Sequence, residues 1–481
     1  MLSMLTVRFH SEPKRSDFGI KNLAHTALIT ATVAAALFGV PLDASAVPSF
    51  ARQTGFPCVA CHTAFPQLTA FGRQFKANGY VISAHATKLP PLAMMIEGGP
   101  GYTHTTEGQD TSTLPSDSHS NDNVKVNQIS LFYAGRLLGP YSDMILPEKV
   151  ADVVNHMGVM GQGTWDGVAD QFSIDNTEFR MANQSAVRGH QLIYGAFVNN
   201  NPGMEDLWNS TPVWGFPFTG SGYAPAPAAS PLIAGGFGQQ VVGAGAYAWL
   251  DAHLYAELGV YGTASSSAQR TLGVDPSGEA EIDGAAPNWR LAYEQQFGAS
   301  MIEVGTFGLD ADTFPQRIEN SGHDHQTDVG LDAQYQWDLG RHDITVMGSS
   351  IFEHASWDAS KVLGFTSSSH DDLWDTAITA TYLFDKTYGL DFQFFTINGD
   401  DDQLLYGSRT GSPDSNGIVV QADYLPFNKM GGPSFWPMSN LKVSLQFTHY
   451  NRFDGSSSNF DGAGRSAQDN DTLFLELWWA L

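Results

Sequence analysis

The chain has 481 residues, of which 42% are hydrophobic and 15% charged, and its formal net charge at pH 7 is −26. That charge has the wrong sign for binding the phosphate backbone of a nucleic acid. Cys58 and Cys61 are the only two cysteines in the sequence, and no second cysteine pair is present to complete a four-ligand zinc site. The composition therefore excludes nucleic-acid partners and leaves the two cysteines as members of one local motif.

Residues 1–46 have the pattern of a long secretory signal peptide. Four basic residues precede an apolar stretch, residues 27–40, and Ala44-Ser45-Ala46 supplies the small side chains of a cleavage site. The apolar stretch is shorter than the roughly 20 residues of a membrane-spanning helix, and no later segment comes closer. The sequence therefore predicts an exported protein whose mature chain begins near Val47 and contains no transmembrane helix.

The mature chain begins with the motif Cys58-Val59-Ala60-Cys61-His62. Cys-x-x-Cys-His is the attachment motif of c-type haem, in which the two thiols form thioethers and the histidine is the proximal iron ligand. A redox-active cysteine pair is the alternative, but it would sit in a βαβ context that does not follow here. We predict one covalent haem c, held by Cys58, Cys61 and His62.

The segment around this motif is basic, whereas the rest of the mature chain is acidic. Residues 47–96 contain no Asp or Glu but four basic side chains, so a segment of net charge +4 precedes a remainder of net charge −31. A cationic segment is attracted into an anionic lumen. Below about 40 residues a chain rarely folds alone. We therefore predict that residues 47–90 form a monohaem plug that depends on both the haem and a surrounding barrel.

Within this plug, the pattern predicts a short helix from Pro66 to Ala77, with Asn78-Gly79 as its stop signal. Its apolar side chains share one face, and they suit either the edge of a porphyrin or packing against a barrel wall: Phe65, Leu68, Phe71 and Phe75. Arg73 and Lys76 are expected near the haem propionates.

Residues 91–481 consist of short alternating apolar segments separated by Gly, Ser, Asn and Asp. A transmembrane β-strand takes about 9–11 residues, with apolar side chains facing lipid and polar or small ones facing the lumen. The predicted strands are residues 92–104, 125–137, 151–163, 170–180, 190–198, 241–250, 252–262, 288–297, 300–308, 328–339, 341–352, 372–384, 388–396, 415–425, 440–450 and 470–481. The fold class is thus all-β: an outer-membrane β-barrel of about 16 antiparallel strands.

Two further patterns favour this barrel over a soluble β-sandwich or propeller. In the last strand, Leu473, Leu475 and Leu477 alternate with more polar residues, among them Glu476. The links after even-numbered strands are mostly short and those after odd-numbered strands mostly long, as with periplasmic turns and outer loops. Residues 199–240 are the longest predicted outer loop. Residues 138–150 and 426–439 are exceptions, because they are long where the pattern requires a short turn.

The distal haem ligand is not fixed by the sequence. Met94 and Met95 begin the first strand, where one of the pair should face the lumen, and a methionine ligand raises the reduction potential of a haem. His85 and His104 are the other candidates. Surface contacts for iron could come from His323-Asp324-His325, Ser369-His370-Asp371-Asp372 or Gly399-Asp400-Asp401-Asp402, which are otherwise ordinary solvated loops.

Residues 50–80 carry a resemblance to a known family. Phe50-Ala51-Arg52-Gln53-Thr54-Gly55, the Cys-x-x-Cys-His-Thr run, Phe65-Pro66-x-Leu68 and Phe71-Gly72-Arg73-x-Phe75-Lys76-x-Asn78-Gly79-Tyr80 resemble the fused cytochrome–porins. These are monohaem outer-membrane cytochromes of bacteria that oxidise ferrous iron. The length and the long signal sequence resemble members from acidophilic iron oxidisers. Over the barrel, the agreement is in length, strand number and C-terminal strand rather than in motifs.

The resemblance implies an oxidoreductase that acts on Fe(II), like an iron:rusticyanin reductase. Extracellular Fe(II) would be oxidised at the cell surface, and the electron would pass to a periplasmic acceptor such as a rusticyanin-like cupredoxin or a cytochrome c. The plug would enter the barrel from the periplasmic side. Two alternatives remain open: a conduit for another donor or acceptor, such as sulfur compounds or outward metal reduction, and a non-redox porin with a structural haem.

Overall fold

The computed structural model describes residues 48–63, 67–81, 90–99, 101–111, 114–115, 117–434 and 439–481, and these belong to one compact unit. The predicted signal peptide, His85 and the start of the predicted helix at Pro66 lie outside the described residues. Among the helices described, none is both long enough and apolar enough to cross a bilayer.

Strands dominate the described chain. They are β1 Leu92–Glu97, β2 Gly101–Thr105, β3 Asn123–Lys125, β4 Gln128–Arg136, β5 Met157–Asp166, β6 Gln171–Val187, β7 His190–Asn199, β8 Val241–Leu250, β9 Leu254–Thr263, β10 Glu281–Ile282, β11 Ala286–Phe297, β12 Ser300–Phe314, β13 Asp324–Asp338, β14 His342–Ser356, β15 His370–Phe384, β16 Tyr388–Gly399, β17 Ser415–Tyr424, β18 Asn440–Arg452 and β19 Thr472–Ala480.

The helices are short. The α-helices are α2 Pro48–Thr54, α3 Cys58–Cys61, α4 Ala70–Ala77, α5 Ser142–Ile145, α6 Glu148–Val154, α7 Ser266–Thr271, α8 Asp358–Leu363 and α9 Gln403–Tyr406. The 3-10 turns are η1 Gly139–Tyr141, η2 Pro212–Trp214, η3 Pro315–Arg317, η4 Glu319–Ser321 and η5 Ala467–Asn470.

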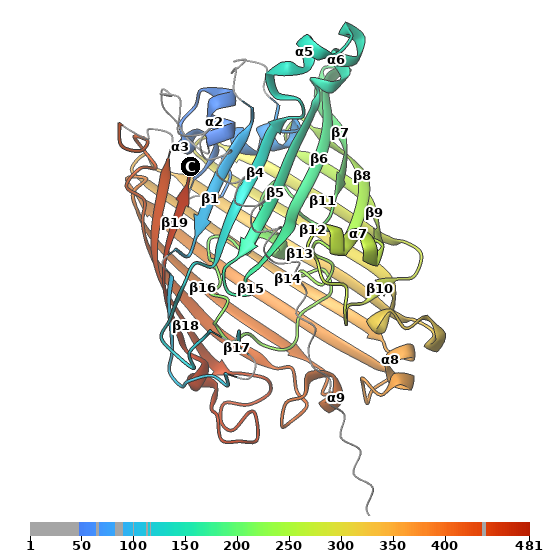
Figure 1. Ribbon diagram of the computed structural model, residues 1–481. Helices are drawn as coiled ribbons and strands as arrows, with labels where there is room; N and C mark the ends of the chain where they lie inside the picture. The colour runs from blue at the N-terminus through green and yellow to red at the C-terminus, as the bar shows by residue number, and fades with distance from the viewer. Residues whose placement is uncertain are drawn as a thin grey trace, which may run out of the picture. The chain divides into compact units, whose positions relative to one another are not determined.

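The sheet closes on itself as an antiparallel barrel (Figure 1). The last strand, β19, pairs with both halves of the first, with Ala480 opposite Met95 in β1 and Leu475 opposite Tyr102 in β2. Each of the pairs β1–β2, β3–β4 and β10–β11 is a single barrel strand with an interruption. The nineteen assigned strands therefore make sixteen strands around the barrel. The predicted fold class and strand number are confirmed.

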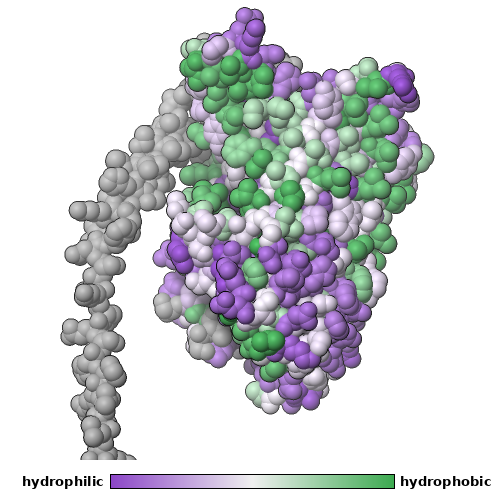
Figure 2. Space-filling view, turned by 90° about the vertical axis from the view of Figure 1, so that its right-hand side faces the viewer, coloured by the Kyte–Doolittle hydropathy of each residue, from purple (hydrophilic) through white to green (hydrophobic). Residues whose placement is uncertain are grey.

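The barrel alternates inside and outside as the sequence predicts. In β19, Glu476 is fully buried toward the lumen, whereas Leu475 on the opposite face is 40% exposed. Exposed apolar residues on the other strands include Leu258 and Leu331. Figure 2 shows hydrophobic side chains gathered over the upper part of one face and hydrophilic ones over the lower part. An outward apolar surface on a closed barrel is the arrangement of an outer-membrane protein.

One predicted strand, residues 151–163, is wrong at its start. Residues 148–154 form α6, and the strand β5 begins only at Met157. Pro147 precedes the first turn of this helix, and a proline just before the helix interior favours helix initiation. The link after β4 is therefore a pair of short helices rather than the first half of a strand.

The prediction that residues 199–240 form an outer loop is also wrong. Residues 200–240, hereafter the inner loop, fold into the barrel, where Met204, Leu207 and Trp208 are at most 1% exposed. The inner loop is fastened to opposite walls. The Trp208 indole nitrogen donates to Glu294 on β11 at 2.7 Å, and Lys442 on β18 donates to the carbonyl oxygen of Pro217 at 3.1 Å.

Helices α2, α3 and α4 form the plug at the end of the barrel where the C-terminus lies, hereafter the plug end (Figure 1). The plug contacts the wall directly, since the backbone N–H of Arg136 at the end of β4 donates to the Gln53 side chain at 3.1 Å. Deeper in the lumen, the Tyr80 hydroxyl donates to Glu178 on β6 at 2.9 Å. These contacts place the Cys-x-x-Cys-His motif inside the barrel, between the wall and the inner loop.

Candidate functional site

The two cysteines lie on a single helical turn. Helix α3 runs from Cys58 to Cys61, and the backbone N–H of His62 closes it by donating to the Cys58 carbonyl oxygen at 2.9 Å. Residues three apart on a helix share one face. His62 leaves the turn in an extended conformation and pairs with Leu68 in an isolated β-bridge. The backbone therefore presents both thiols and the imidazole from one compact segment.

Helix α4 packs tightly against this turn. The Thr69 hydroxyl donates to the Ala60 carbonyl oxygen at 2.7 Å and accepts from the Gly72 N–H at 3.1 Å, so one side chain caps α4 and ties it to α3. A Cβ atom at Gly72 would lie 2.3 Å from the Cys61 carbonyl oxygen. Only glycine permits this approach. The predicted helix ends at Ala77 with its stop at Asn78-Gly79 as expected, but its predicted start at Pro66 is wrong. Residues 67–69 are not helical, because Leu68 pairs with His62 and Thr69 caps a helix that begins at Ala70.

The plug aromatics pack against one another, and their contact with a porphyrin edge stays a prediction. Phe75 packs edge-on against Phe50 with ring centroids 5.0 Å apart, and Phe50 stacks on Tyr80 at 5.6 Å. Phe71 packs against Phe56 at 5.3 Å. Of these rings, those of residues 50, 56, 75 and 80 also line the cavity described next.

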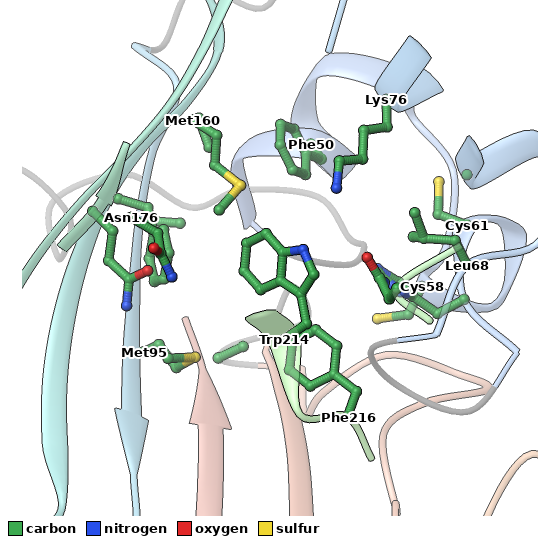
Figure 3. A pocket seen from close by; sticks show the side chains of 18 of the residues that line it. Phe50, Cys58, Cys61, Leu68, Lys76, Met95, Met160, Asn176, Trp214 and Phe216 are labelled. Atoms are coloured by element: carbon green, nitrogen blue, oxygen red, sulfur yellow. The ribbon is translucent and has the colours of Figure 1, made fainter. Parts of the chain in front are cut away.

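A cavity of about 580 Å³ lies between the plug, the wall and the inner loop. Cys58, Cys61 and His62 line it from the plug. Met95 on β1 and Met160 on β5 line it from the wall, and Figure 3 shows Trp214 and Phe216 of the inner loop between these two sides. Pockets of roughly 300–1,000 Å³ with mainly apolar walls accommodate organic ligands and cofactors.

Aromatic rings from the inner loop form one boundary of this cavity. Trp214 stacks on Phe216 with ring centroids 5.7 Å apart, and Phe216 lies 6.3 Å from Trp478 on β19. The Lys76 ammonium lies 5.1 Å from the centre of the Trp214 ring, a cation–π contact between plug and inner loop.

Polar side chains also line the cavity, among them Glu97, Gln162 and Asp175. Glu97 on β1, 8% exposed, accepts a hydrogen bond from the Gln128 amide at 2.7 Å. Asn440 on β18 donates to the Cys58 sulfur at 3.4 Å. The wall thus orients one of the two thiols from a strand almost 400 residues later in the chain.

The two predicted propionate partners are already engaged elsewhere. Arg73 does not line the cavity: its guanidinium forms an ion pair with Glu294 at 2.8 Å and also donates to Gln336 at 3.1 Å. Lys76 does line the cavity, but its ammonium donates to the carbonyl oxygens of Met204 and Asp206 at 2.8 and 2.6 Å. Both basic residues hold the plug to the wall and to the inner loop.

Among the candidate distal ligands, the structure brings the methionines to the cavity and keeps His104 away from it. Met95 shares the lumen face with Ala93 and Glu97, and Met94 is its neighbour on β1. His104, on β2, is exposed and paired with Asp122 at 2.9 Å.

The sequence analysis missed Met160, which lies on the lumen face of β5 with its sulfur directed into the cavity (Figure 3). Its alternation with Gln162 and Thr164 was the signal that could have identified it. Trp214 and Phe216 carried no such signal, because the whole inner loop was assigned to the outside.

The outer clusters named as iron contacts are used to build loops. Asp324, 1% exposed, accepts from the backbone N–H groups of Ala359 and Ser360 at 2.9 Å, and so caps α8. Trp357 donates to Asp371 at 2.7 Å. Among the described residues, no group of three or more His, Cys, Asp or Glu side chains is arranged to hold a metal ion.

The residues around the cavity fit a haem c. Such a cofactor requires two thiols one turn apart, an imidazole beside them and apolar walls around the porphyrin. Cys58, Cys61 and His62 meet the first two requirements, and the methionines and aromatic rings meet the third. Polar side chains of the lining such as Glu97 can orient groups within the cavity, and Asn440 contacts the Cys58 sulfur.

Several solved structures are similar to this chain at low sequence identity. No protein-family model matches the chain, and no curated protein matches it either. Solved structures that resemble it include an anion-selective porin from Comamonas acidovorans (11% identity, 81% of this chain and 97% of that one, TM-score 0.43). The outer membrane channel DcaP of Acinetobacter baumannii has 11% identity over 83% of this chain and 100% of that one, with a TM-score of 0.44.

Proposed function

We propose that this outer-membrane barrel is a c-type cytochrome that oxidises extracellular Fe(II) and delivers the electron to a soluble periplasmic acceptor. The observation that carries the proposal is the Cys58–His62 motif on the wall of a large apolar cavity inside the barrel. When bound, a single haem c supplies a one-electron carrier at this position. The plug end would then face the periplasm, as the short turns of such barrels do.

The chain's own residues support an electron path rather than an open pore. Glu294 holds the plug and the inner loop together, because its carboxylate accepts from Arg73 at 3.0 Å and from Trp208 at 2.7 Å. Lys76 adds a second link between the two through the Met204 carbonyl oxygen at 2.8 Å. The apolar band of such a barrel is about 25 Å tall. A carrier held within it would be reached from both sides while ions are excluded.

The residues around the motif have separate roles in this proposal. Cys58 and Cys61 would form the thioethers, and His62 would be the proximal ligand. Thr69 and Gly72 fix the turn that carries them, while Asn440 orients the Cys58 sulfur. Trp214 and Phe216 would limit access of water to the cavity from the inner-loop side.

The test compares donors on the purified protein. We expect Fe(II) to reduce the haem bands at the pH of the outer medium, and thiosulfate or sulfide to do so more slowly. A Cys58→Ser, Cys61→Ser double variant, purified in the same way, should contain no covalent haem in a denaturing gel. Haem bands that Fe(II) leaves oxidised would overturn the iron donor. Faster reduction by a sulfur donor would favour the conduit for another substrate.

The non-redox porin is the second candidate, favoured by the barrel itself. Planar bilayers distinguish it, because an open barrel of sixteen strands leaves an aqueous channel. We expect the wild-type protein to conduct far less than an open porin, and Trp214→Ala to conduct more than the wild type. Trp374→Ala, on an outward half-exposed position of β15, is the matched control and should not change conductance. Porin-like conductance of the wild type would favour the porin.

A further inference from the structure

The link between β4 and β5 exposes an apolar surface at the plug end. Residues 138–156, hereafter the helical hairpin, comprise η1, α5 and α6. Their exposed apolar side chains are Tyr141 (42%), Met144 (79%), Ile145 (64%), Val150 (46%) and Val153 (53%). Isolated exposed apolar residues are common on protein surfaces, but a contiguous group on one short segment indicates an interaction site.

The helical hairpin is held in a defined shape. The Ser142 hydroxyl donates to the Asn155 side chain at 2.5 Å, and the Asn155 amide donates to Asp143 at 2.9 Å, which joins α5 to the end of α6. Its two ends are fastened where the backbone N–H of Leu137 donates to the Met157 carbonyl oxygen at 2.9 Å. The apolar side chains are therefore presented by a folded element, so little ordering would be needed when a partner binds.

The helical hairpin lies beyond the ends of β4 and β5, next to the plug (Figure 1). Gly139, at its base, approaches Pro91 closely, and Arg136 immediately before it contacts Gln53 of α2. A partner seated on the helical hairpin would thus stand over the plug, outside the apolar band of the strands.

The charges around the apolar surface indicate the chemistry of the partner. Asp143, Glu148 and Asp152 are exposed there, and the exposed basic side chains are Lys149 and His156, of which only the lysine is ordinarily charged at neutral pH. Interfacial helices that lie on membranes carry Lys and Arg on their polar face instead. A second copy of the same surface would oppose acid to acid, which is unfavourable. An apolar centre with an acidic rim is complementary to a protein surface with an apolar centre and a lysine rim.

We propose that the helical hairpin is the docking surface for a soluble protein whose apolar contact patch is surrounded by lysines. This partner is the periplasmic electron acceptor, an assignment that rests on the proposed function. Docking places the partner directly over the plug that carries the Cys-x-x-Cys-His motif. The acidic rim guides the encounter, and the apolar side chains supply the contact area.

The experiment measures binding to the full-length protein in lipid nanodiscs, with no Fe(II) present. The probes are a lysine-rich soluble cytochrome c and the same protein acetylated on its lysines. The test variant is Met144→Ser with Ile145→Ser, and the matched control is Met430→Ser, an 84% exposed methionine in the link between β17 and β18 at the same end.

We expect the unmodified probe to bind wild type and Met430→Ser within twofold of each other. The double variant should bind it at least tenfold more weakly, as should wild type with the acetylated probe. Equal affinity for wild type and the double variant, or no binding of the lysine-rich probe to wild type, would overturn the proposal. The proposal would also be overturned if wild-type nanodiscs hold two copies of the protein that the double variant separates. It would be overturned as well if the same two serine changes release the helical hairpin from the lipid surface.

The binding assay is independent of the proposed function. If Fe(II) fails to reduce the haem while the double variant still loses binding, the docking surface stands and the iron donor falls. If Fe(II) reduces the haem and the double variant binds normally, the iron donor stands and the docking surface falls.

Discussion

Gly72 connects the motif to the helix behind it, because its missing side chain allows α4 to touch the Cys61 carbonyl oxygen. Gly72→Ala would place a Cβ atom 2.3 Å from that oxygen, which is backbone and cannot turn aside. We expect a loss of about 1–3 kcal/mol, the usual cost of overpacking, and a lower yield of covalently attached haem. Thermal unfolding and in-gel haem content measure the two effects.

The control for Gly72 is Gly262→Ala on β9, which does not line the cavity. A Cβ atom at Gly262 would meet only the Gly284 carbonyl oxygen, at an ordinary 3.8 Å, so this variant should behave as the wild type. If Gly72→Ala attaches haem as well as Gly262→Ala and melts at the same temperature, the close packing of α3 on α4 is not needed for the site.

Met95 is the candidate distal ligand on the lumen face of β1, and Met94 alternates with it. We expect Met95→Leu to change the haem absorbance and lower its reduction potential, because methionine ligation raises that potential. Met94→Leu should leave both unchanged. The measurement is a spectroscopic redox titration of each variant. A change confined to Met160→Leu would instead assign the ligand to β5, and no change in any variant would exclude all three methionines.

At the scale of elements, the sequence predicted strands well and inward packing poorly. Fifteen of the sixteen predicted strands coincide with observed strands of the barrel, because alternation of apolar and polar residues is a local signal. Two of these strands are longer than predicted, since β6 runs on to Val187 and β12 to Phe314. The start of the strand at residues 151–163 failed because Pro147 and the residues after it favour a helix. The inner loop failed because its anchors, such as Glu294 and Lys442, lie far away in sequence.

The candidate site also contains residues that a local pattern predicted and residues that only the fold brings together. Cys58, Cys61 and His62 were predicted from a contiguous motif, and the structure places all three on one cavity. Met160 and Trp214 reach this cavity, and Asn440 reaches the Cys58 sulfur, only because the barrel closes and the inner loop folds inward. Arg73 was assigned by charge alone, whereas its position depends on Glu294, whose placement no local pattern reveals.

The Asp402 side chain holds the loop between β16 and β17 in place through hydrogen bonds. It caps α9 by accepting from the backbone N–H groups of Leu404 and Leu405 at 2.9 and 3.0 Å, and it also accepts from those of Ser367 and Ser368. Burial opposes its ionisation, but these hydrogen bonds together with that from Thr366 outweigh burial and lower the pKa of Asp402 well below the usual value of an aspartate.

This lowered pKa makes the stability of the loop depend on pH. A carboxyl group whose pKa is lower in the folded than in the unfolded state contributes its full stabilisation of the fold at pH values above the unfolded pKa. This contribution is lost as the pH falls through the folded pKa. We expect Asp402→Asn to speed hydrogen exchange in residues 400–414 at neutral pH. The difference from wild type should persist down to about pH 4 and shrink only in stronger acid. Asp401→Asn, at the exposed neighbour, should change little. A difference that disappears near pH 6 would contradict this assignment.

In the proposed function of the whole molecule, electrons cross the barrel while iron stays outside. The plug and the inner loop fill the lumen from two directions and meet at Lys76 and at Glu294. In the proposed function, this arrangement would let electrons cross the barrel without the passage of ions, which neither an open porin nor a soluble cytochrome would do.

The most direct test uses proteoliposomes that enclose ferric lysine-rich cytochrome c and receive Fe(II) only on the outside. We predict that the enclosed cytochrome becomes reduced and that no iron is found inside. In liposomes with the Cys58→Ser, Cys61→Ser protein, the enclosed cytochrome should stay ferric. An enclosed cytochrome that stays ferric, or one that is reduced only as iron enters, would contradict it.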